Sequence, residues 1–132
     1  MSETATMITA ALHRVQNGHR KVFSVEPAAG PVRRPARVAV MLALAHYVRS
    51  AIDDGRVRNQ SDAASRLGYT PARMSQLLDL LLLAPDLQER VLELEAIDGV
   101  QPLPERLLRP VLHIARWDQQ RLAFPKLLSR LG

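Results

Sequence analysis

Two short segments with helical spacing of apolar residues lie on either side of Gly68. Small and apolar side chains stand four residues apart before the glycine and three apart after it. Such spacing places them on one face of each helix, so the pattern predicts one helix at about 60–67 and another at about 70–80. Small Ala64 lets the helices approach closely, and the predicted hinge core is Ala63, Leu67, Tyr69, Met74 and Leu77.

Capping residues support the same register. Asn59 is a favourable N-cap for the first helix, and Asp62 brings a carboxylate to the positive end of that helix. Thr70 is a favourable N-cap for the second helix, and Pro71 follows at the first helical position, where its missing N–H is no loss. Gly68 falls in the tight turn, where a positive φ is expected. The segment therefore predicts a helix-turn-helix.

Longer-range patterning predicts a mainly α protein, a helix-turn-helix bundle of about five to six helices with an N-terminal β-hairpin. Pro35 is expected to open a helix that reaches about Asp54, and Pro85 a short helix through about Leu94. Residues 97–104 are predicted to be a loop. Further helices are expected at 103–113 and 117–131, where Pro110 and Pro125 should kink or break them.

The N-terminal part has a different composition. Asn17-Gly18 favours a type I′ turn, which predicts a β-hairpin at about 12–25. A lone hairpin is marginal in water, so it is expected to be a solvated tip, a DNA-contacting wing or a dimerising strand. The Pro- and Gly-rich residues 26–36 are predicted to be a linker, neither helix nor strand. We therefore expect a basic hairpin and arm at 1–34 and a helical domain at 35–132.

Charge is distributed unevenly along the 132 residues. Residues 1–58 hold nine Arg or Lys against four Asp or Glu, whereas the remainder holds nine of each, so the net charge of +5 lies upstream of residue 59. A phosphate backbone attracts such a segment without regard to sequence. The candidate phosphate contacts are Arg14, Arg20 and Lys21 in the hairpin, and Arg33, Arg34 and Arg37, which could enter a minor groove.

Other chemistry is poorly represented. The chain has no cysteine, which excludes disulfides and thiolate metal sites and favours a cytoplasmic setting. Its apolar runs are too short to span a membrane. The four histidines are scattered, and His46 is expected to be structural rather than a ligand. No phosphate-binding glycine loop is present. We therefore expect no enzyme activity, no metal and no cofactor.

The run QSDAASRLGYTPARMSQLLDLLLLAPDLQERVLE resembles the helix-turn-helix of the ParB and KorB partition proteins over residues 58–93. The arginine-rich nucleotide-binding motif of ParB proteins is missing upstream. The resemblance implies site-specific binding of double-stranded DNA, without partition or nucleotide hydrolysis, at the nucleoid. RRPARVAVMLALAH and LPERLLRP also resemble parts of small ParB-like proteins found on mobile elements near recombinases. A transcriptional regulator or a mobile-element accessory factor is the expected function.

In this interpretation the second helix enters the major groove by its N-terminal turn. Arg73 suits guanine or a phosphate, Gln76 suits adenine, and Ala72 could touch a thymine methyl; a solvated helix face is the alternative for Arg73 and Gln76. Gln60 and Ser61 are placed to meet a phosphate. The predicted reading and positioning residues of the motif are Gln60, Ser61, Thr70, Pro71, Ala72, Arg73, Ser75, Gln76 and Asp79.

One helix reads only a few base pairs, so a homodimer on a repeated or palindromic site is expected. Trp117, Phe124 and Leu128 are expected to close the core, or alternatively to form an exposed stripe that joins two subunits. The helix-turn-helix itself is nearly neutral. This leaves a second hypothesis open, in which it is a protein-interaction module that docks on a recombinase or another DNA-processing partner.

Overall fold

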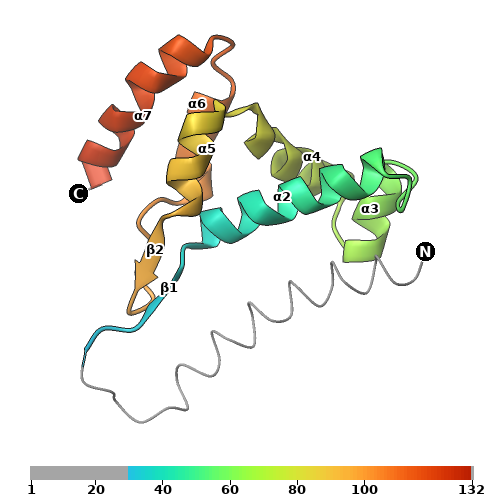
Figure 1. The fold of residues 1–132 in the computed structure, drawn as a ribbon, viewed down its shortest axis with the longest axis horizontal. Coiled ribbons are helices and arrows are strands. Elements are labelled where there is room, and N and C mark those ends of the chain that lie inside the picture. Colours follow the sequence, from blue (N-terminus) through green and yellow to red (C-terminus); the bar gives the residue numbers. More distant parts are fainter. Residues whose placement is uncertain (1–29, 132) are drawn as a thin grey trace.

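A computed structural model describes residues 30–131, and Figure 1 shows the long helix α2 (Arg37–Asp53) running through the middle of the molecule. The predicted end of this helix is confirmed, since Asp54 is its C-cap and Gly55 follows with φ 76°. The predicted start is two residues too early. Pro35 belongs instead to a strand, and Ala36 is the N-cap of the helix.

The strand β1 (Arg33–Pro35) pairs antiparallel with β2 (Glu95–Ile97), with Arg34 opposite Ala96. The prediction that residues 26–36 contain no strand is therefore wrong at β1. Proline is tolerated there because it ends the strand and this two-stranded sheet has only edge positions. The predicted hairpin at 12–25 lies outside the described residues.

A tight turn follows β2. Asp98 and Gly99 both have positive φ, 53° and 80°, and Ile97 and Val100 exchange backbone hydrogen bonds across them. This is the geometry of a two-residue hairpin turn. The loop predicted for residues 97–104 thus begins as ordered structure, and its Asp-Gly pair is the local signal for that turn.

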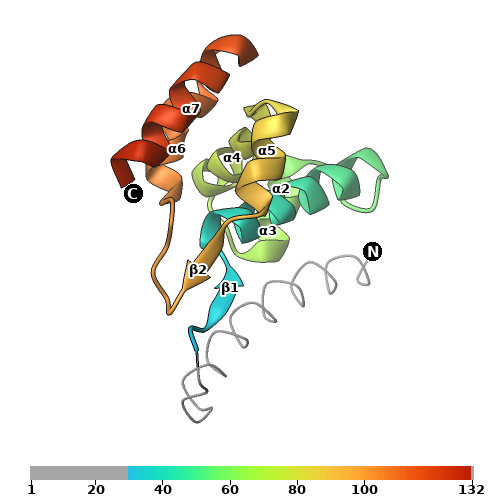
Figure 2. The same cartoon turned by 60° about the vertical axis from the view of Figure 1, so that its left-hand side comes forward.

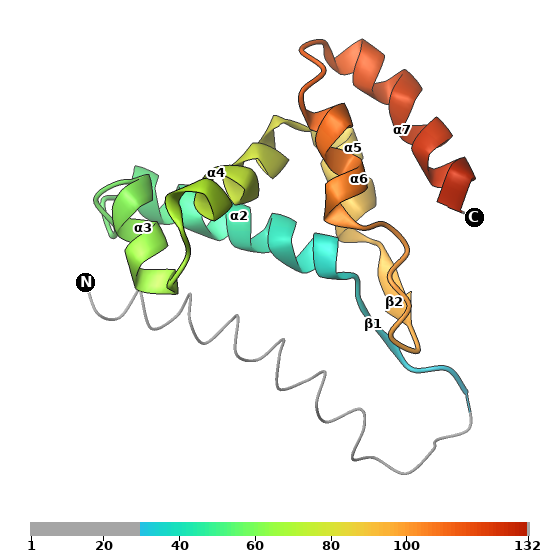
Figure 3. The ribbon, with the colours of Figure 1, turned by 180° about the vertical axis from the view of Figure 1, so that it is seen from behind.

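The helix-turn-helix has the predicted elements, α3 (Gln60–Leu67) and α4 (Pro71–Asp79). A 3-10 turn, η1 (Leu80–Leu82), then leads into α5 (Pro85–Leu92). Both proline starts, at positions 71 and 85, are confirmed. Seen from behind in Figure 3, α4 lies along α2, and α3 lies at the end of α2 farthest from the sheet.

The last two helices are α6 (Glu105–Leu112) and α7 (Trp117–Leu131). Each continues past its proline, Pro110 or Pro125, so the break that was one of the two predicted outcomes does not occur. A proline inside a helix costs about 3 kcal/mol through a lost hydrogen bond and a clash with the preceding turn. Burial of neighbouring side chains, Val111 and Leu112 in α6 and Phe124 in α7, offsets that cost. In Figure 2, α7 runs beside α6 on the outside of the molecule.

One hydrophobic cluster joins α2 to the helices around it. Phe124 is fully buried in it, whereas Trp117 is 49% exposed and Leu128 is partly buried. The predicted stripe is therefore divided, with Phe124 in the core and Trp117 at the surface.

No helix among residues 30–131 is long and apolar enough to cross a membrane.

Candidate nucleic-acid interface

The turn between α3 and α4 is closed by local hydrogen bonds. Asn59 Oδ1 accepts the Asp62 backbone N–H at 2.9 Å, and Thr70 Oγ1 accepts that of Arg73 at 3.1 Å. Gly68 adopts the left-handed conformation with φ 70° and ends α3. Both predicted N-caps and the predicted glycine turn are confirmed. The turn between α3 and α4 is therefore fixed by interactions within residues 59–73.

The carboxylate of Asp62 offsets the partial positive charge at the start of α3. Its carboxylate accepts the backbone N–H of Arg58 and a hydrogen bond from Arg66. These contacts, the backbone bond first and the Arg66 bond second, hold the pKa of Asp62 below its ordinary value. A carboxylate at this helix end reduces its attraction for an external anion. A phosphate near Gln60 and Ser61 would therefore meet a weaker positive end than a bare helix terminus presents.

Most of the predicted DNA-reading residues of the motif lie at the surface. Pro71, Ala72 and Ser75 are exposed on the first turns of α4, as are Thr70 and Gln76. Gln60 and Ser61 are exposed at the start of α3. Gln60 Nε2 donates to Ser75 Oγ at 2.9 Å, which joins the two helices on their outer side. The structure thus brings the predicted phosphate-contacting end of α3 next to the predicted reading face of α4.

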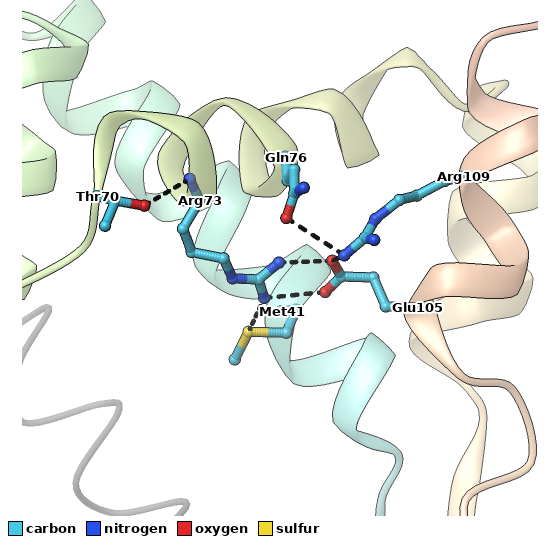
Figure 4. Close-up of polar contacts among 6 residues, drawn as sticks. All are labelled: Met41, Thr70, Arg73, Gln76, Glu105 and Arg109. Atoms are coloured by element: carbon cyan, nitrogen blue, oxygen red, sulfur yellow. Dashed lines mark hydrogen bonds and ion pairs between the residues drawn. The ribbon is translucent and has the colours of Figure 1, made fainter.

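Arg73 departs from the expected solvent-facing position. Figure 4 shows its guanidinium directed toward Glu105 at the start of α6. Nη1 and Nη2 donate to the two carboxylate oxygens of Glu105 at 2.6 and 3.0 Å, and Nη2 also lies 3.5 Å from the sulfur of Met41. The Arg73 side chain is 31% exposed and that of Glu105 only 13%. Arg73 is therefore part of an interhelical ion pair.

Two further polar pairs connect the same helices. Arg109 Nη2 donates to Gln76 Oε1 at 3.3 Å, and His113 Nε2 lies 4.0 Å from Asp79 Oδ2. We call the three pairs together the polar seam, formed by residues 73, 76 and 79 of α4 and residues 105, 109 and 113 at α6. The spacings of three and four residues are those of single helix faces. Three predicted DNA-reading residues thus lie along one seam.

Glu105 holds the charged end of the seam together. Besides Arg73, it accepts a hydrogen bond from Arg109 Nη2 at 3.2 Å. Partial burial by itself would raise the pKa of Glu105, but the hydrogen bonds and charges of Arg73 and Arg109 outweigh it and lower that pKa. The same bond raises the pKa of Arg73. Glu105 is therefore a carboxylate held ionised between two guanidinium groups.

Of the described arginines of the predicted basic arm, one forms an ion pair with another described residue and two do not. Arg33 forms an exposed ion pair with Glu95 at 3.4 Å. Arg34 and Arg37 are also exposed, and neither takes part in an ion pair among residues 30–131. Arg37 lies one turn before Met41 in α2, so it occupies the side of the molecule that Arg73 reaches. The other predicted contacts, Arg14, Arg20 and Lys21, lie outside the described residues.

Within residues 30–131 no group of three or more acidic or histidine side chains is placed to hold a metal ion. His46 Nε2 instead lies 2.6 Å from Gln88 Oε1, which links α2 to α5. This contact agrees with the expectation that His46 is structural.

Glu105, Arg109 and Met41 are the residues that sequence reasoning missed. Glu105 and Arg109 are four apart in α6, and an acid–base pair at that spacing is usually an ordinary surface pair. Nothing local indicates that Glu105 also reaches Arg73, 32 positions earlier.

No protein-family model, no curated protein and no solved structure matches the chain.

Proposed function

We propose that this protein binds specific sites on double-stranded DNA through α3 and α4, as a transcriptional regulator or an accessory factor of a mobile element. The observation that carries the proposal is the helix-turn-helix, whose Gly68 turn and two side-chain caps hold α4 with an exposed first turn. A short recognition helix presented by its N-terminal turn is the usual way in which such a motif enters the major groove.

The chemistry of the exposed surface fits this use. Thr70, Ser75 and Gln76 carry groups that hydrogen-bond to base edges or phosphates, and Ala72 offers a methyl group. Exposed Arg34 and Arg37 add positive charge. Since α3 and α4 are nearly neutral by themselves, most of the affinity should come from basic residues elsewhere and fall steeply with salt.

The first test selects fragments bound by the full chain from a random or genomic pool and measures mobility shifts on the selected site across a salt series. Specific binding should appear and weaken as salt rises. A repeated or palindromic selected site would support a homodimer, and one monomer bound to an asymmetric site with full affinity would contradict it. No specific band at any salt would contradict the proposal itself.

A single substitution tests which surface binds. Ala72→Glu places a carboxylate on the first turn of α4, where it favours the helix but repels DNA. We expect at least a roughly tenfold loss of affinity for the selected site. The matched control is Ala43→Glu, also an exposed alanine within a helix, which lies on the other side of α2 from Met41. Equal losses in both variants would exclude α4 as the contact surface.

A second candidate function is a protein-interaction module that docks on a recombinase or another DNA-processing protein. Two observations favour it: the polar seam already uses Arg73 and Gln76, and Trp117 is half exposed on α7. This function would be supported if the protein bound a purified recombinase but produced no mobility shift with DNA. Trp117→Ala should then weaken the binding to the recombinase.

A further inference from the structure

The seam residue Glu105 occupies the donor groups that Arg73 would need for DNA. Both terminal nitrogens of the Arg73 guanidinium point at the Glu105 carboxylate, at 2.6 and 3.0 Å (Figure 4). A guanidinium binds guanine or phosphate in bidentate fashion through its parallel N–H groups. One terminal pair cannot serve two acceptors in that way at once, so Arg73 must leave Glu105 before it can use this pair on DNA.

Gln76 is held in a comparable way. Bidentate reading of adenine uses both the oxygen and the nitrogen of a glutamine amide. In this structure Gln76 Oε1 accepts a hydrogen bond from Arg109, whose Nη2 also donates to Glu105. The carboxylate of Glu105 therefore holds Arg73 directly and Gln76 through Arg109. Both polar side chains that the sequence assigns to hydrogen bonding with bases therefore depend on Glu105.

We propose that Glu105 sets the DNA affinity of this protein by competing with DNA for the guanidinium groups of Arg73 and Arg109. This inference rests on the proposed function. Glu105 acts from α6, outside the helix-turn-helix, and need not touch DNA itself. In the free protein its single negative charge offsets one of the two positive charges of Arg73, on the reading helix, and Arg109, on α6. When DNA binds, phosphate or guanine oxygens replace the carboxylate as their acceptor.

The burial of Glu105 makes the competition effective. Its side chain is only 13% exposed, so water replaces few of its contacts with Arg73. Hydrogen bonds between charged groups in such surroundings are stronger than those between neutral groups. Releasing Arg73 from Glu105 should therefore reduce the apparent affinity for DNA by about tenfold relative to a chain in which Arg73 is already free.

The test is Glu105→Gln in the full chain, with affinity measured on the selected site. Gln removes the charge and keeps the shape, so we expect DNA to bind about tenfold more tightly than in the wild type. Glu89→Gln is the matched control. It makes the same charge change at an exposed glutamate of α5 that forms no ion pair among residues 30–131, and it should change affinity much less.

A double variant tests whether Arg73 carries the gain. In a chain that already contains Arg73→Ala, Glu105→Gln should raise affinity by no more than about threefold, because the main guanidinium for which Glu105 and DNA compete is absent. A steeper salt dependence of Glu105→Gln than of the wild type would also support the release of cations for phosphate. All variants are measured where circular dichroism shows them folded.

If Glu105→Gln does not fold, Glu105→Asp replaces it in the same assay. The shorter side chain keeps the charge but lengthens the contact with Arg73, so a smaller gain is expected. Competition is overturned by an unchanged or weaker affinity in the variant that folds. It is also overturned by an equal gain in Glu89→Gln, or by the full gain in the Arg73→Ala background. A wild type that binds no DNA would instead refute the proposed function.

Discussion

Gln60 in the first turn of α3 donates a hydrogen bond from Nε2 to Ser75 Oγ on the outer side of α4, at 2.9 Å. The two residues are fifteen positions apart and face the solvent together. This bond orients the Gln60 amide over the gap between the two helices. It links a residue expected to meet a phosphate with one expected to lie near bases.

Ser75→Ala tests whether the bond between Gln60 and Ser75 acts on DNA binding or on the stability of the fold. Removing an exposed hydrogen bond should lower the free energy of unfolding by less than about 1 kcal/mol. Loss of the Gln60 anchor and of the Ser75 hydroxyl should together weaken binding to the selected site about fivefold, because the amide must then be ordered on binding and one polar group of the surface is gone. Mobility shifts measure the affinity and urea titration the stability. Ser65→Ala, another exposed serine of the motif, is the control, and equal affinities of the two variants would contradict a role for the bond.

Gly68→Ala should destabilise the chain through the backbone alone. A Cβ at Gly68 would meet no atom within 4 Å, so there is space for it, but the φ of 70° is unfavourable for a residue with a Cβ. The expected loss is about 1–2 kcal/mol in the free energy of unfolding. Gly68→Asn is the comparison, because asparagine tolerates this conformation better and should lose less. Thermal or urea unfolding gives both values, and equal losses would point to a cause other than φ.

Gln120→Leu should strongly destabilise the fold, although leucine and glutamine side chains have similar volumes. The Gln120 side chain is 1% exposed; it accepts the Ala84 N–H at 2.8 Å and donates to the carbonyls of Leu82 and Ile114. Leucine would leave the buried Ala84 N–H and the two part-buried carbonyls without these partners, at a cost of about 2–4 kcal/mol. Gln119→Leu changes an exposed neighbour in the same helix and should be nearly neutral. A small loss for Gln120→Leu in urea titration would mean that α7 is not held by these bonds.

Acid should weaken the fold partly through Glu105. Its pKa is lowered in the folded state from an ordinary value of 4.5, so its contribution to stability is present above about pH 4.5 and is lost as pH falls through the folded pKa. Glu105→Gln should therefore show a shallower loss of stability between about pH 5 and 3. Urea titrations at several pH values measure this, with Glu89→Gln as the control. Parallel curves for wild type and Glu105→Gln would show that Glu105 does not contribute.

The amino-acid sequence by itself determined the helix-turn-helix. Asn59, Gly68, Thr70 and Pro71 act through their own backbone and the residues next to them, so their effects can be read without knowledge of the rest of the chain. The Asp98-Gly99 turn has the same local character, and its signal was available in the sequence.

Only the tertiary structure decided what lies beside α4. The contact between Arg73 and Glu105 spans 32 positions and depends on where α6 lies relative to α4 and Met41. The strand at 33–35 likewise exists because β2, some 60 residues later, supplies its hydrogen bonds. Long polar side chains can reach many partners, and periodicity does not choose among them. Packing places α6 beside α4, and that placement brings Arg73 to a carboxylate rather than to solvent.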